Sequence, residues 1–204
     1  CLLWLCVVFV SLIRRPPRST LLPYTARLRS QLECAQLLLE ASAAVNQARN
    51  DGATPLYMAC QKGHVEIARL LLEAGAVVDQ ASGNGVTPLL MACHHGHLEV
   101  AKLLSSYGAS RTATPFGTPE EVANRDGHAD LAAWLVASRG WTPLAHLESL
   151  TAARALSLLR SGASLHEGEP TPLQRAAGGE GEAAALIRRA AAPWSPASHS
   201  LFPA

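Results

Sequence analysis

A period of 33 residues constrains the fold of this chain more than any other feature of its sequence. Residues 50–82 align with residues 83–113, so that Thr54 matches Thr87 and Gly63 matches Gly96, 33 positions on. Self-similarity at such a period is typical of a stacked array, in which each unit buries its apolar face against its neighbours. The sequence therefore predicts a solenoid of repeats.

Each unit carries the same signals for where helices begin and end. A threonine hydroxyl is a good N-cap, and proline is favoured at the first helical position, so each Thr-Pro pair predicts a helix start. These threonines are Thr54, Thr87, Thr118, Thr142 and Thr171. About nine residues later, Gly63, Gly96 and Gly127 are expected to take the left-handed conformation that ends a short helix. A second helix with an apolar face follows each glycine, which makes every unit a helix–turn–helix.

The repeats are predicted to occupy about residues 30–191. A partial unit at about 30–49 precedes units at 50–82, 83–113 and 114–138, and the last of these has a shortened opening loop. We interpret residues 141–167 and 170–191 as degenerate units, because they keep Thr-Pro-Leu but lose most other landmarks. Residues 192–204, rich in proline and serine, are expected to be a C-terminal tail that is truncated.

The pattern resembles the ankyrin repeat, which runs DGxTPLHxAAxxGHxEVVxLLLxxGADVN. The resemblance implies an all-α solenoid of stacked helix–turn–helix units joined by short β-turn fingers. One position departs from the family in every unit, because the histidine after Thr-Pro-Leu is absent. We therefore expect its hydrogen bonding to the threonine to be lost throughout, and its place is taken by Tyr57, Leu90, Glu121, Ala145 and Gln174.

Residues 1–29 are expected to be non-globular or artefactual. The apolar run at 1–13 is too short to span a membrane, and its arginines follow the run, whereas a secretory signal carries its charge first. Residues 14–30, RRPPRSTLLPYTARLRS, resemble translated sequencing-adapter read-through. We therefore do not expect a membrane anchor.

Composition and motifs narrow the function classes. The net charge is +1 and the chain has no basic run, so we expect no nucleic-acid partner. It contains no GxSxG, no HExxH and no phosphate-binding glycine loop, so we expect neither catalysis nor a cofactor nor a small-molecule substrate. Five cysteines without a CxxC pair indicate free thiols and a location in the cytoplasm or nucleus.

The stretch MACHHGHLEV at 91–100 invites a metal interpretation that the repeat frame argues against. Cys93 aligns with Cys60, at a position where the family has a small buried residue. His97 aligns with His64 and His128 in the turn, and histidines one repeat apart are too distant to share a metal. His94 and His95 are then two ligands without a carboxylate or thiolate in reach, so we predict no metal site.

The resemblance implies that a partner protein binds through the fingers and the groove side of the first helices. The matching residues are Asn50, Ala53, Gln61, Lys62, Gly83, Val86, His94, His95, Tyr107, Arg125 and Asp126. We expect a monomeric, non-catalytic scaffold or adaptor. The alternative is a regulatory or substrate-recruiting segment of a larger enzyme whose catalytic domain lies outside this chain.

Overall fold

Helices make up the regular structure of the computed structural model, which describes residues 24–192. Between these limits the only β-pairing is an isolated bridge from Thr114 to Gly117. The helices are α2 (Tyr24–Glu40), α3 (Pro55–Lys62), α4 (Val65–Glu73), α5 (Pro88–His94), α6 (Leu98–Ser106), α7 (Pro119–Arg125), α8 (Ala129–Ala137), the 3-10 helix η1 (Pro143–Ala145), α9 (Ala152–Arg160), α10 (Pro172–Gly178) and α11 (Glu182–Ala191). The all-α prediction is confirmed.

The predictions for the two ends of the chain fall largely outside this range. The apolar run at 1–13 and the tail from 193 onward lie outside the described residues, whereas α2 begins at Tyr24, within the adapter-like stretch. None of the described helices has the length and apolar character needed to cross a membrane.

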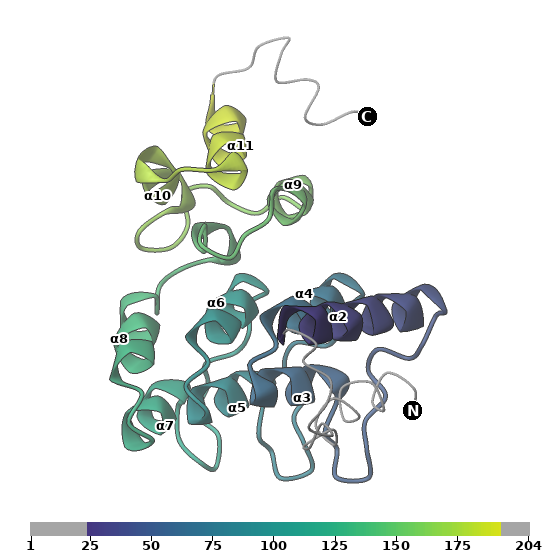
Figure 1. The fold of residues 1–204 in the computed structure, drawn as a ribbon. Coiled ribbons are helices and arrows are strands. Elements are labelled where there is room, and N and C mark those ends of the chain that lie inside the picture. Colours follow the sequence, from purple (N-terminus) through teal and green to yellow (C-terminus); the bar gives the residue numbers. More distant parts are fainter. Residues whose placement is uncertain (1–23, 193–204) are drawn as a thin grey trace. The chain divides into compact units, whose positions relative to one another are not determined.

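The described chain forms two compact units. The first contains residues 24–101 and 110–132, and the second contains residues 102–109 and 133–192. In the first unit α5 packs between α3 and α7, while α4 packs against both α3 and α2 (Figure 1). In the second unit α11 packs against α9 and α10, and α10 packs against η1. The first unit holds nearly all of the predicted binding residues.

The predicted Thr-Pro pairs begin helices. Thr54, Thr87, Thr118 and Thr171 each accept a hydrogen bond from the backbone N–H three residues later, and α-helices α3, α5, α7 and α10 follow. Thr142 differs, because it begins only the three-residue η1 and makes no side-chain cap bond. The prediction is therefore confirmed for four pairs and holds for the fifth only as a single 3-10 turn.

In two units, the residue that replaces the family histidine forms a hydrogen bond with the N-cap threonine. Glu121 and Gln174 complete capping boxes, in which their side chains accept hydrogen bonds from the backbone N–H groups of Thr118 and Thr171. A glutamate or glutamine at this place can reach back to the N-cap, whereas a leucine or alanine cannot. In these two units a bond from glutamate or glutamine to the N-cap residue therefore stands in place of the histidine bond.

Valine substitutions at Thr87 and Thr142 should distinguish a threonine hydroxyl that caps a helix from one that makes no hydrogen bond. Thr87→Val removes the acceptor for Leu90 N and should lower the free energy of unfolding by about 1 kcal/mol. The Thr142 Oγ1 atom is buried without a hydrogen-bond partner, so Thr142→Val should leave stability unchanged or raise it. Urea denaturation followed by circular dichroism measures both, and equal losses would show that the cap bond has no special weight.

Small and aliphatic side chains form the interior of the first unit. Leu71, Leu89 and Ala92 are fully buried, as are the sulfur-bearing side chains of Cys60 and Cys93. Cys60 and Cys93 are also free thiols, as predicted. The expectation of free thiols is wrong for Cys34, which is disulfide-bonded.

Candidate functional site

The turn histidines connect consecutive repeats. His97 Nε2 lies 3.2 Å from the carbonyl oxygen of Gln61, and His128 Nε2 lies 3.2 Å from that of His94. Gln61 and His94 occupy the same place in successive units, 33 residues apart. Because a carbonyl only accepts hydrogen bonds, Nε2 is the donor in both contacts. The predicted structural role of these histidines is therefore visible as a recurring bond to the preceding unit.

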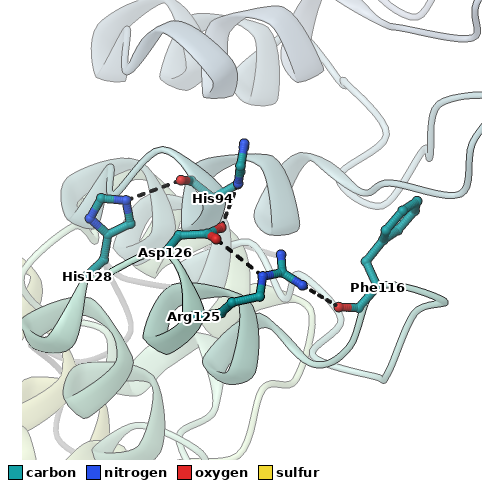
Figure 2. A network of polar contacts seen from close by, with 5 residues as sticks. All are labelled: His94, Phe116, Arg125, Asp126 and His128. Atoms are coloured by element: carbon teal, nitrogen blue, oxygen red, sulfur yellow. Dashed lines mark hydrogen bonds and ion pairs between the residues drawn. The ribbon is translucent and has the colours of Figure 1, made fainter.

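A second network joins the ends of α5 and α7 (Figure 2). His94 Nδ1 lies 2.6 Å from Asp126 Oδ2, and the other carboxylate oxygen of Asp126 accepts a bond from Arg125 Nε at 3.2 Å. Arg125 Nη1 donates in turn to the carbonyl of Phe116 at 3.4 Å. The bond to His94, followed by that to Arg125, holds the pKa of Asp126 below its ordinary value. Asp126 and Arg125 thus link α5, α7 and the turn at 114–117.

This network corrects one premise of the metal argument. The carboxylate of Asp126 is within reach of His94. Even so, no group of three or more histidine, cysteine, aspartate or glutamate side chains suited to a metal occurs in residues 24–192.

His95 lies in a cluster of imidazole rings. Its ring centroid is 4.8 Å from that of His94 and 6.0 Å from that of His97. Partial burial lowers the pKa of His95, and the charges of His94, His97, Lys62 and His128 lower it further. His95 therefore stands, uncharged at neutral pH, in surroundings that disfavour another positive charge.

Stability should fall as the solution is acidified. The pKa values of His95 and His64 lie below their ordinary value of 6.5 in the folded chain, so near and below that pH the unfolded chain binds more protons. We expect the free energy of unfolding to decrease from pH 7.5 to 5.5. It should decrease again below about pH 4, where the Asp126 carboxyl binds a proton more readily in the unfolded chain than in the folded one. Urea titrations across this range measure the loss.

Glutamine variants provide the control for this pH dependence. Replacing His64 and His95 together by glutamine should flatten the curve between pH 7.5 and 5.5 and leave the loss below about pH 4 in place. A double variant with the wild-type slope would assign the acid sensitivity to other groups.

The predicted binding residues are distributed unevenly. Lys62, His94, His95 and Arg125 are exposed where α3, α5 and α7 end, and Gln61 and Asp126 beside them are half-buried. In the turns between repeats, Asn50 and Gly83 are exposed and Val86 is half-buried.

Two predicted residues do not belong with this set. Ala53 is only 4% exposed, so its side chain offers almost no surface for a partner to contact. The Asp51 side chain accepts a bond from Ala53 N and Arg49 N donates to the Ala53 carbonyl, which closes the turn and leaves the methyl group inside. Tyr107 belongs to the second unit, where the Arg154 guanidinium lies 4.5 Å from its ring centroid.

Sequence reasoning missed Phe116. This residue is 46% exposed at the turn before α7, and its carbonyl is the acceptor for Arg125. The available signal was an aromatic side chain in a turn of a chain with only 5% aromatic residues.

The repeat geometry agrees with the comparison to known families. The model of the ankyrin repeat family, in three copies, matches residues 22–115. Residues 22–115 are ankyrin repeats. No curated protein matches the chain. Ankyrin repeats are in general non-catalytic modules that bind other proteins, and the helices, caps and glycine turns described above form the array that the family name implies.

Proposed function

We propose that the ankyrin array binds another protein through the C-terminal ends of α3, α5 and α7. The repeat surface, as we call it, consists of five exposed residues, Lys62, His94, His95, Phe116 and Arg125. The observation that carries the proposal is the position of these residues at corresponding ends of α3, α5 and α7 and at the adjoining turn.

The contacts beneath the repeat surface favour recognition. Asp126 fixes the His94 ring and the Arg125 guanidinium, so these two side chains lose little freedom when a partner binds. Arginine and aromatic residues are also over-represented among the residues that dominate binding energies. On this proposal the chain is a monomeric, non-catalytic adaptor, and the remaining fingers contribute the edge of the contact.

Site-specific photo-crosslinking tests the proposal with the full chain. Benzoylphenylalanine in place of His95 should form adducts with a distinct protein when the chain is irradiated in cell extract. The same group in place of Glu73, exposed at the end of α4 in the same unit, is the matched control. Adducts at position 73 without any at position 95 would place the binding surface elsewhere.

A further inference from the structure

The repeat surface has a positive balance. Lys62 is exposed at the end of α3, and the Arg125 side chain is 58% exposed at the end of α7. The carboxylate of Asp126 is occupied on one oxygen by His94 and on the other by Arg125. The Glu121 carboxylate is also engaged, because it accepts the bond from Thr118 N. The repeat surface should therefore attract negatively charged groups.

The rings of His94 and His95 lie beside these groups. His94 Nδ1 is held by Asp126, and its other ring nitrogen points away from that carboxylate (Figure 2). His95 stands between His94 and His97, close enough to Lys62 for that charge to act on it. A partner's amine would be repelled by the charges of Lys62 and Arg125, whereas a carboxylate would be attracted to them and could also accept a hydrogen bond from the N–H of the His95 ring.

Phe116 supplies an apolar contact beside these charges. Its side chain extends from the turn at 114–117, and Arg125 holds its backbone carbonyl. A solvent-exposed aromatic ring next to a guanidinium suits a segment in which an apolar side chain adjoins an acidic one.

We propose that the repeat surface binds an extended acidic segment of the partner protein, with carboxylates at Lys62, His95 and Arg125 and an apolar side chain on Phe116. Helices pack roughly 8–10 Å apart, so α3 and α7 are separated by about 16–20 Å across α5. At about 3.3 Å per residue, a strand-like segment of roughly five or six residues covers that distance. The inference rests on the proposed function and specifies the chemistry of the partner.

Nucleic acid is the less favoured anionic ligand. The surface carries two permanent cations, and the whole chain has a net charge of +1. Phosphate backbones are bound through many lysine and arginine contacts, which this surface does not offer.

Peptide selection against the full chain tests the inference. Short random peptides are displayed on phage and selected for binding, and selected peptides are synthesised for fluorescence anisotropy. We expect enrichment of aspartate and glutamate next to a leucine or an aromatic residue. Lys62→Glu should weaken binding by about tenfold, and Phe116→Ala should weaken it by several-fold. Binding should also weaken as salt screens the charges.

Matched variants show whether these losses are specific to the surface. Arg160→Glu reverses an exposed charge at the end of α9, and Val77→Ala shortens an exposed apolar side chain. Neither residue belongs to the repeat surface, so both variants should bind as the wild type does. Melting temperatures identify any variant that fails to fold, and Lys62→Gln then replaces Lys62→Glu.

The outcomes distinguish this inference from the proposed function. Basic or uncharged peptides that are lost with Phe116→Ala would overturn the acidic partner while leaving the surface in use. Binding insensitive to both Lys62→Glu and Phe116→Ala would overturn the surface itself. Failure to select any peptide would overturn the proposal that the surface binds an acidic segment. Tighter binding of a single-stranded oligonucleotide, with the same sensitivity to Lys62→Glu, would also overturn it.

Discussion

Replacing Gly96 by alanine should lower the free energy of unfolding by about 2 kcal/mol. Gly96 has a φ of +72°, and a side chain in this left-handed region costs about 1 kcal/mol. An added Cβ would also lie 2.4 Å from Nδ1 of His128, so the imidazole must move. Movement of that ring breaks its bond to the His94 carbonyl, which contributes about 1 kcal/mol more. Urea denaturation of Gly96→Ala measures the total.

Gly127 provides a matched control for this prediction. It occupies the same turn in the next unit with a φ of +86°, but an added Cβ there has no atom within 4 Å. Gly127→Ala should therefore cost only the conformational part, about 1 kcal/mol. If both variants lose the same stability, the approach of the next repeat's histidine does not matter.

The thiols of Cys60 and Cys93 should react about a thousandfold more slowly in the folded chain than in the unfolded chain. The thiolate is the nucleophile, and burial raises the pKa of Cys93 from its ordinary value of 9.0 to about 12. Burial raises the pKa of Cys60 as well, and both side chains are fully inaccessible to solvent. Alkylation by iodoacetamide at pH 8, quantified by mass spectrometry, gives the two rates.

Urea supplies the reference rate for this experiment, because both thiols become accessible when the array unfolds. Rapid modification of either cysteine without denaturant would show that the first unit opens readily around α3 and α5. Loss of protection at Cys93 in the Gly96→Ala variant would connect the two predictions.

Features that depend on a few adjacent residues could be predicted. The Thr-Pro caps and the left-handed glycines follow from backbone chemistry within one turn, and the repeat period places them in every unit. The burial of Cys60 and Cys93 followed from the same alignment, because equivalent positions of a stacked array face equivalent neighbours. The prediction of helix starts was least accurate in the unit at 141–167, where Thr142 and Pro143 begin only a 3-10 turn.

Features that depend on side chains from two units could not be predicted. The contact between His94 and Asp126 joins residues 32 positions apart and depends on the rotamers at the ends of two helices. The burial of Ala53 depends on how Asp51 closes a turn, and the exposure of Phe116 depends on the turn that carries it.

The sequence by itself determined the repeat period, the helix boundaries and the set of helix ends at which a partner is expected. These are properties of local chain chemistry repeated along one axis. The tertiary structure decided which side chains at those ends are occupied and which are available. Asp126 is engaged from two sides, and Lys62, His95 and Phe116 remain exposed, because only the packing of neighbouring units brings charges and rings within contact distance.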